Sequence, residues 1–193
     1  MKIFLDVGAH IGQTLEVVID RKYAFDKIVC FEPVAENIEK LRTFPDERII
    51  ICDYGLWNET CLRQIYNPKS MGASLFSDKF KENVKSQKIK LVQASKWFEK
   101  NLRLEDRIFL KLNCEGAEVT ILKDLISSGE YKKIDVLMVD FDVRKIPSQK
   151  HFMNEMKATL KTLDIPKMFF ADEIYSGETH NQFTRKWLDK CND

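Results

Sequence analysis

Short apolar runs recur along the chain, and each ends at a glycine or a polar residue. The runs cover Ile3–Val7, Lys27–Phe31, Arg48–Cys52, Arg107–Leu112 and Ile134–Phe141. Largely apolar runs of this length are typical of strands that are buried on both faces of a parallel sheet. The pattern therefore predicts five core strands.

Between and after these runs, apolar residues recur at helical spacing. Helices are expected over residues 13–22, 35–44, 119–126 and 149–163, and two further strands near Lys167–Ala171 and Asn181–Thr184. Alternating strands and helices are typical of a doubly wound, mostly parallel α/β sheet with helices on both faces. Residues 1–193 are expected to form a single domain, because the rhythm blurs only around residues 56–104, where an insertion or an antiparallel edge hairpin is predicted.

The first apolar run leads into a glycine-containing loop. Its sequence is Asp6-Val7-Gly8-Ala9-His10-Ile11-Gly12. A glycine directly after a strand lets the backbone turn tightly and approach a ligand, and the second glycine lets the next helix pack close to the strand. Asp6 stands at the carboxyl end of the strand, where open α/β sheets bind ligands, although a turn acid that caps a local amide explains Asp6 equally well.

Acidic residues also stand at the tips of the second and third predicted strands. Glu32-Pro33 follows the second strand, and Glu32 comes 20 residues after Gly12. A βαβ nucleotide-binding unit presents an acid to ribose hydroxyls at about this interval. Asp53-Tyr54 follows the third strand and is expected to border an adenine ring, with a turn acid as the alternative for Asp53.

The overall charge and composition exclude several classes of protein. The chain of 193 residues has a formal net charge of +1, which gives no strong signal for nucleic-acid binding. No stretch approaches the roughly 18 apolar residues of a membrane span, and the first strand begins almost at Met1, so a cytoplasmic protein is expected. Residues 79–111 are rich in lysine, which indicates either a solvated face or a surface for an anionic substrate.

Cysteine and histidine spacing indicates neither disulfides nor metal. The five cysteines are scattered without a Cys-x-x-Cys pair, and the three histidines, His10, His151 and His180, lack ligand spacing. We therefore expect no disulfide framework and no protein-bound metal.

Three motifs together resemble those of the FkbM-type S-adenosylmethionine-dependent methyltransferases. They are the loop Asp6–Gly12, Phe31-Glu32-Pro33 and the segment Lys111-Leu112-Asn113-Cys114-Glu115-Gly116-Ala117-Glu118. The chain departs from the family pattern at His10, where asparagine is usual, and at Asn113-Cys114, where aspartate-valine is usual. The resemblance implies a Rossmann-like class I methyltransferase fold with a seven-stranded sheet, S-adenosylmethionine as methyl donor, and a hydroxyl of a sugar, glycan or similar small molecule as acceptor.

The loop chemistry favours the same cofactor. Dinucleotide-binding loops have a third, closely placed glycine so that backbone amides can surround a pyrophosphate, and here bulkier residues fill that space. S-adenosylmethionine has no phosphate. Asp6 would then face its ammonium group and Glu32 its ribose, with Asn113 near the sulfonium. The residues assigned to the cofactor are Asp6, Gly8, Ala9, His10, Gly12, Glu32, Pro33, Asp53, Tyr54 and Asn113.

A hydroxyl acceptor needs a base, for which Glu115 is the first candidate because it follows the strand nearest the methyl group. Asp142 is the second candidate and His180 a weaker one. Glu115 and Glu118 are also explained as acids that cap the start of a helix, and this explanation is the stronger one for Glu118.

The sequence leaves two questions undecided: which function the protein has, and which segment covers the cofactor pocket. An NAD-type oxidoreductase and a cofactor-binding relative without catalytic activity are the alternatives to a methyltransferase. Group transfer is favoured in a site that is closed to water, so some part of the protein is expected to cover the pocket. The candidates are the insertion, the segment 175–187 and a neighbouring subunit in a homodimer. The insertion is favoured because Met71-Gly72-Ala73-Ser74 has the small residues of a movable loop.

Overall fold

The first three strands form one half of a parallel sheet. β1 (Lys2–Val7), β2 (Lys27–Phe31) and β3 (Ile49–Cys52) lie side by side in the computed structural model, which describes residues 1–192. Leu5 of β1 is level with Val29 of β2, so the two strands end at the same edge. Each strand is followed by a crossover segment that returns the chain to the opposite edge, as parallel pairing requires.

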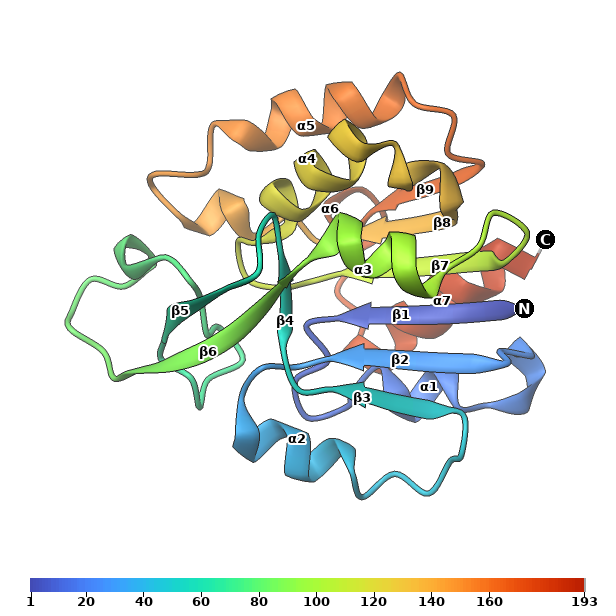
Figure 1. Cartoon of the computed structure of the whole chain (residues 1–193), viewed down its shortest axis with the longest axis horizontal. Coiled ribbons are helices and arrows are strands. Elements are labelled where there is room, and N and C mark those ends of the chain that lie inside the picture. Colours follow the sequence, from blue (N-terminus) through green and yellow to red (C-terminus); the bar gives the residue numbers. More distant parts are fainter. Residues whose placement is uncertain (193) are drawn as a thin grey trace.

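The second half of the sheet lies on the other side of β1. β7 (Arg107–Leu112) pairs with β1, followed outward by β8 (Ile134–Val139) and β9 (Lys167–Phe170). Over residues 1–192 the strand order is β3-β2-β1-β7-β8-β9, with parallel pairing throughout (Figure 1). The order reverses beside β1, and the fold is therefore the predicted doubly wound, Rossmann-like α/β sheet.

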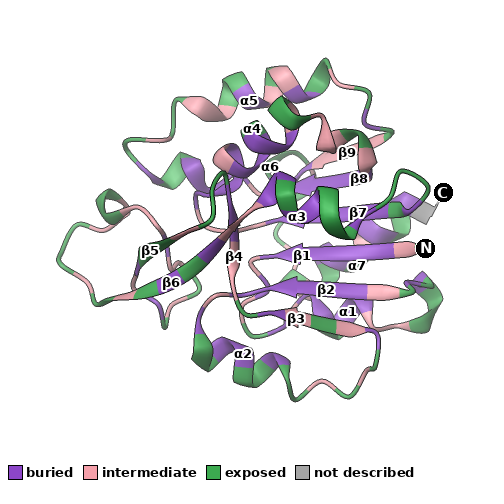
Figure 2. Cartoon of the chain, viewed as in Figure 1, coloured by how far each residue is buried: buried purple, intermediate pink, exposed green. Residues whose placement is uncertain are grey.

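Helices cover both faces of this sheet. α3 (Ala94–Asn101), α4 (Glu118–Ser128) and α5 (Phe152–Lys161) pack on one face, and α1 (Leu15–Val18) and α7 (His180–Asn192) on the other (Figure 1). The short helices α2 (Ala35–Leu41) and α6 (Ala171–Ile174) follow β2 and β9. The central strands are buried along almost their whole length (Figure 2), which explains why their sequences are apolar runs rather than alternating patterns.

The insertion forms a second, smaller sheet. β4 (Gly55–Trp57) is parallel to β6 (Ser86–Gln93), and β5 (Cys61–Tyr66) is antiparallel to β6. Ile89 is buried on β6 while its neighbours Lys88 and Lys90 are exposed. The lysines of this strand are therefore exposed to solvent, whereas the side chains of Lys79 and Lys111, in the same lysine-rich run, are largely buried in ion pairs.

Two expectations about the sheet were wrong. The main sheet has six strands within the described residues rather than seven, and Asn181–Thr184 is the first part of helix α7, not a strand. Phe183, Trp187 and Leu188 are buried at helical spacing against the sheet. This packing stabilises a helix in place of a strand.

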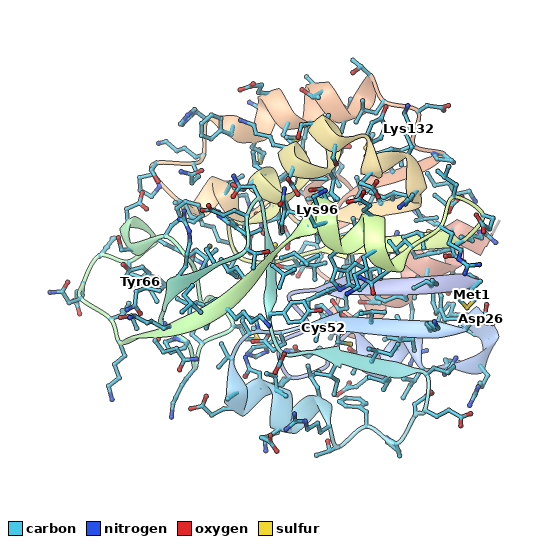
Figure 3. All side chains as sticks on the ribbon, in the orientation of Figure 1. Met1, Asp26, Cys52, Tyr66, Lys96 and Lys132 are labelled. Atoms are coloured by element: carbon cyan, nitrogen blue, oxygen red, sulfur yellow. The ribbon has the colours of Figure 1, made fainter. Side chains whose placement is uncertain are left out.

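The carboxyl ends of the strands face the insertion. Figure 3 places Met1 and Asp26 at the amino ends of the strands, and Cys52, the last residue of β3, at the opposite end, toward Tyr66 of the insertion. Open parallel sheets bind ligands at the carboxyl edge. Among residues 1–192, none of the helices has the length and apolar character needed to cross a membrane.

Candidate functional site

Three strand tips and the insertion enclose a cavity, which we call the first cavity. It contains about 650 Å³ of space, part of it open to solvent. The strand tips contribute Gly8, His10, Glu32, Pro33, Asn113 and Glu115, which are six of the predicted site residues. The remaining wall is largely apolar and includes Val7, Phe31, Leu56, Ile65, Ile89 and Leu91.

Gly8 holds the tips of β1 and β7 together. Its φ is +84°, and an added Cβ would lie 2.0 Å from the carbonyl oxygen of Asn113. A side chain there would therefore push the loop away from β7, so glycine is needed both for its left-handed conformation and for this close approach. Gly12 has a related role at a different place, because a Cβ there would lie 2.5 Å from the ring of Phe44. The neighbour that Gly12 accommodates is thus the segment after α2, and Gly12, predicted to bind the cofactor, does not line the first cavity.

Glu32 is the buried acid of the first cavity. Only 5 % of the residue is exposed, and its carboxylate accepts hydrogen bonds from the backbone N–H of His10 (2.9 Å), the backbone N–H of Val34 (2.9 Å) and the Asn37 amide (3.2 Å). Burial raises the pKa of Glu32, while the Val34, Asn37 and His10 hydrogen bonds oppose that rise. The carboxylate ties the glycine loop to the tip of β2, and it has hydrogen-bonding capacity left for a ligand, since a carboxylate can accept about four hydrogen bonds.

Asp6 does not lie in the wall of the cavity. Its side chain is fully buried, and Oδ1 lies 2.7 Å from Nζ of Lys111 on the adjacent strand β7. Lys111 Nζ also lies 3.3 Å from the carbonyl oxygen of Gly8. The cation beside Asp6 is therefore Lys111 of the same chain. The prediction that Asp6 directly contacts the ammonium group of a ligand was wrong.

Three further predicted residues lie beside the cavity rather than in its wall. Asp53 is exposed, and Ala9 is packed into the core that α1 and α7 cover. Tyr54 packs against Phe31, and its hydroxyl accepts a hydrogen bond from Trp97 Nε1 at 3.1 Å. Burial raises the pKa of Tyr54 to about 12. The next residues along the chain, Gly55 and Leu56, reach the cavity instead.

The insertion, which the sequence analysis favoured as the cover of the pocket, forms one wall of the first cavity. Ser70, Met71, Ala73 and Leu75 line the first cavity, and Met71 Sδ accepts a hydrogen bond from Gln13 Nε2 at 3.4 Å. Ile89 and Leu91 of β6 complete this wall, and they alternate along the strand with exposed lysines. That alternation identifies an apolar face but not what it covers.

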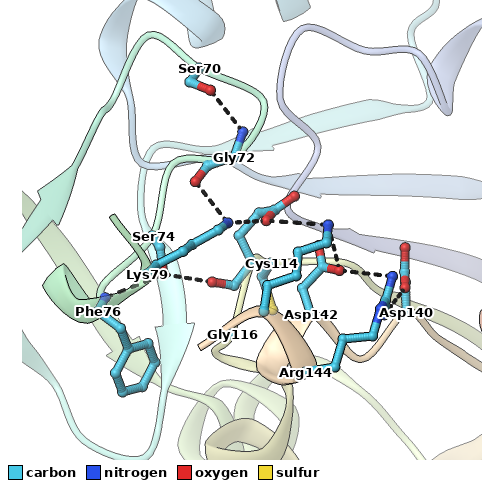
Figure 4. Close-up of polar contacts among 12 residues, drawn as sticks. Ser70, Gly72, Ser74, Phe76, Lys79, Cys114, Gly116, Asp140, Asp142 and Arg144 are labelled. Atoms are coloured by element: carbon cyan, nitrogen blue, oxygen red, sulfur yellow. Dashed lines mark hydrogen bonds and ion pairs between the residues drawn. The ribbon is translucent and has the colours of Figure 1, made fainter. Parts of the chain in front are cut away.

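Glu115 and Asp142, the two predicted bases, lie together in a charged cluster, because Lys145 contacts both carboxylates. Figure 4 shows Asp142 of this cluster with Lys79 and Arg144 nearby. Lys79 of the insertion forms an ion pair with Glu115, and Lys145 Nζ lies 3.9 Å from Glu115 and 2.8 Å from Asp142. Asp142 is 1 % exposed and lines neither the first cavity nor the second cavity defined below. Burial and the adjacent Glu115 carboxyl raise the pKa of Asp142. The Glu115 carboxylate is thus engaged by lysine at the edge of the cavity.

Glu118 caps the loop between β7 and α4. Its carboxylate accepts hydrogen bonds from the backbone N–H groups of Cys114 (3.0 Å) and Gly116 (3.1 Å). Burial raises the pKa of Glu118 to about 8. Both amides belong to the loop that precedes α4, so Glu118 holds this loop in place, whereas the expectation was a cap on the helix itself.

A second cavity adjoins Asn113 on the other side of the β7 tip. It is bounded by the ends of β7 and β8 and by the segment around α6 and the start of α7, and it contains His180, the weakest of the predicted bases. Within residues 1–192, no group of three or more His, Cys, Asp or Glu side chains is placed to hold a metal ion.

The residues of the first cavity fit S-adenosylmethionine. Glu32 presents a partly used carboxylate to the cavity, the backbone at Gly8 forms part of the wall without a side chain, and the apolar wall suits a purine ring. Sheet order, glycine loop and acidic strand tip define the class as a Rossmann-like α/β protein with its site at the switch point of the sheet.

Comparisons with known proteins identify the family. Residues 6–192 match the methyltransferase FkbM domain, and the chain therefore belongs to the FkbM methyltransferase family. A crystal structure of methyltransferase FkbM from Methylobacillus flagellatus KT is similar, with 18 % identity and a TM-score of 0.43, over 66 % of this chain and 29 % of that chain. A search of curated proteins gives no significant match.

Proposed function

We propose that the protein binds S-adenosylmethionine in the first cavity and transfers its methyl group to a hydroxyl of a sugar, glycan or similar small molecule. The observation that carries this proposal is the position of Glu32, a buried carboxylate in the cavity wall that is hydrogen-bonded to the glycine loop at His10. Family membership supports methyl transfer as the reaction and speaks against the oxidoreductase alternative.

Each part of the cavity wall has a task in this proposal. Glu32 accepts hydrogen bonds from ribose hydroxyls, the loop around Gly8 and His10 accommodates the amino-acid end, and Asn113 borders the reacting centre. When bound, the cofactor supplies an activated methyl group. The protein contributes alignment of donor and acceptor and exclusion of water, which account for much of the acceleration of such transfers.

Calorimetric titration with S-adenosylhomocysteine tests the cofactor site. We expect Glu32→Gln to bind about 10- to 100-fold more weakly than the parent, because hydrogen bonds to a charged group are worth about 1.5 to 3 kcal/mol each. The matched control is Glu39→Gln, since Glu39 lies on α2 nearby but is exposed in a surface pair with Arg42. Equal affinity of parent and Glu32→Gln, with the fold intact, would place the ribose elsewhere.

Turnover separates an enzyme from an inactive relative. Incubation with S-adenosylmethionine labelled in its methyl group and a mixed panel of methyl glycosides should yield labelled glycoside, whereas NAD should give no heat in the same calorimeter. Binding of S-adenosylhomocysteine without transfer to any member of the panel would favour the relative without catalytic activity.

A further inference from the structure

The second cavity lies directly beside the first. It contains about 850 Å³ of space, part of it open to solvent, and Asn113 lines both cavities. The two cavities therefore meet at the tip of β7. A donor in the first cavity and an acceptor in the second would approach each other there, at the carboxyl edge of the sheet.

The charged groups around the second cavity are already paired with one another or with their neighbours. The pairs are Lys111 with Asp6 (2.7 Å), Arg144 with Asp140 (2.7 Å), Glu178 with Lys186 (3.0 Å) and Asp172 with Lys157 (2.7 Å). The wall thus offers many hydrogen-bonding groups, but its positive and negative charges balance one another locally. Such a wall suits a neutral ligand with several hydroxyl groups better than a phosphate or a polycation.

Aromatic rings add an apolar surface to this polar wall. Tyr175 is 57 % exposed and packs its ring against Phe183, with ring centroids 6.0 Å apart. Both residues line the cavity. A sugar ring has a C–H face that can pack on such rings and a rim of hydroxyls for the polar groups, so the two parts of the wall match the two parts of a sugar.

His180 is the group in this wall that is suited to accept a proton. Its Nε2 lies 3.1 Å from Oγ1 of buried Thr14, and in the tautomer in which Nε2–H donates to Thr14, Nδ1 has a free lone pair. Partial burial and the positive charge of Lys111 lower the pKa of His180, which favours the neutral imidazole. Asn113, at the junction of the cavities, carries an amide that does not take up a proton near neutral pH.

We propose that the second cavity binds a neutral, polyhydroxylated acceptor such as a sugar ring, and that His180 accepts the proton of the hydroxyl that is methylated. This inference rests on the proposed function, which supplies the sulfonium methyl donor. The acceptor oxygen forms the new bond to the methyl carbon, the carbon–sulfur bond breaks with its electron pair left on sulfur, and the hydroxyl proton moves to the imidazole. The products are a methyl ether, a neutral thioether and a protonated His180.

The three histidines of the chain permit a test that does not depend on turnover. His10 lies in the first cavity, His180 in the second, and His151 lies apart from both, stacked on Phe152. We would record imidazole NMR spectra of the full chain, with signals assigned by His→Gln variants. S-adenosylhomocysteine should move the His10 signal. Methyl α-glucoside, methyl α-mannoside and methyl α-rhamnoside, added at millimolar concentration, should move the His180 signal and leave that of His151 in place.

The outcomes separate the two proposals. If S-adenosylhomocysteine moves His10 but none of the glycosides moves His180, the acceptor site is wrong and the cofactor site stands. If S-adenosylhomocysteine neither moves His10 nor titrates, the proposed function fails.

A second arm tests the proton acceptor alone. His180→Gln should lower the methylation rate by about 100-fold or more with the affinity for S-adenosylhomocysteine within about threefold of the parent. His151→Gln, the control, should leave both unchanged. Parent-like turnover by His180→Gln would overturn the role of His180.

Discussion

At the scale of single residues, the two buried acids at the strand tips have partners at very different distances along the chain: Glu32 binds the nearby glycine loop, and Asp6 binds Lys111. Glu32 could be predicted from the sequence because the number of residues between Gly12 and Glu32 is set within one βαβ unit, whose parts are close together in the chain. The partner of Asp6 could not be found in this way, because Lys111 lies on a strand that becomes a neighbour of β1 only in the folded sheet. A lysine within an apolar run was nevertheless a signal, since a buried lysine requires a partner.

The Asp6–Lys111 ion pair should be costly to break from one side. Lys111→Met leaves the Asp6 carboxylate fully buried without its cation, and Asp6 Oδ2 already has no hydrogen-bond partner within the described part of the chain. We expect the free energy of unfolding in urea to fall by about 3 to 5 kcal/mol. The double variant Asp6→Leu/Lys111→Met should be more stable than Lys111→Met, because no unpaired charge remains.

An exposed ion pair serves as the control for this cycle. Lys96→Met removes the surface pair with Glu99 on α3 and should leave the free energy of unfolding nearly unchanged, because solvent screens an exposed pair. Equal destabilisation by Lys111→Met and by the double variant would mean that Asp6 tolerates the loss of its cation, and the pair would not be the electrostatic unit described above.

At the scale of elements, the central strands and helices were predictable because each is encoded by a local pattern. The C-terminal helix was not predicted, because the four residues around Phe183 are also compatible with a strand. Only the continuation of the buried apolar positions to Trp187 and Leu188 identifies a helix. The loop from Asn113 to Glu118 is a mixed case. Its acids were identified, but whether each caps, binds or reacts depends on Lys79 and Lys145, which come from other elements.

The buried acid Glu118, at the start of α4, should make stability depend on pH. The pKa of Glu118 is about 8 in the folded protein and about 4.5 in a free side chain, so between these values the folded state binds more protons than the unfolded state. The stabilisation that comes from this uptake is fully present below about pH 4.5 and is lost as the pH rises toward 8. Urea unfolding at pH 5, 6.5 and 8 should therefore show the parent losing stability relative to Glu118→Gln.

Glu99→Gln is the matched control for this measurement, because Glu99 is an exposed acid on α3. Its difference from the parent should not decline over the same pH range. A difference between parent and Glu118→Gln that stays constant from pH 5 to 8 would show that Glu118 does not take up a proton on folding.

At the scale of the whole molecule, segments far apart in the chain cover the two cavities. The insertion lies over the first, and the segment around α6 and the start of α7 lies over the second. The sequence could nominate the insertion because its glycine and small residues are typical of a movable loop. The sequence could not identify what holds the loop in place, because its contacts with Glu115 join residues that are far apart in the chain. Lys79 Nζ lies 2.8 Å from the Gly72 carbonyl oxygen and also contacts Glu115, and Ser74 Oγ donates a hydrogen bond to the Glu115 carbonyl at 2.6 Å.

These contacts should control access to the first cavity. Loss of a hydrogen-bonded ion pair worth about 1.5 kcal/mol raises the population of an open loop about tenfold. Lys79→Met and Glu115→Gln should therefore each increase the rate of chymotrypsin cleavage between residues 67 and 90 about tenfold. The double variant should be cleaved no faster than either single one, because both remove the same pair. Lys85→Met, an exposed lysine of the same insertion, is the control. S-adenosylhomocysteine should slow cleavage there in the parent; protection of residues 175–187 instead would identify the C-terminal segment as the cover of the cofactor.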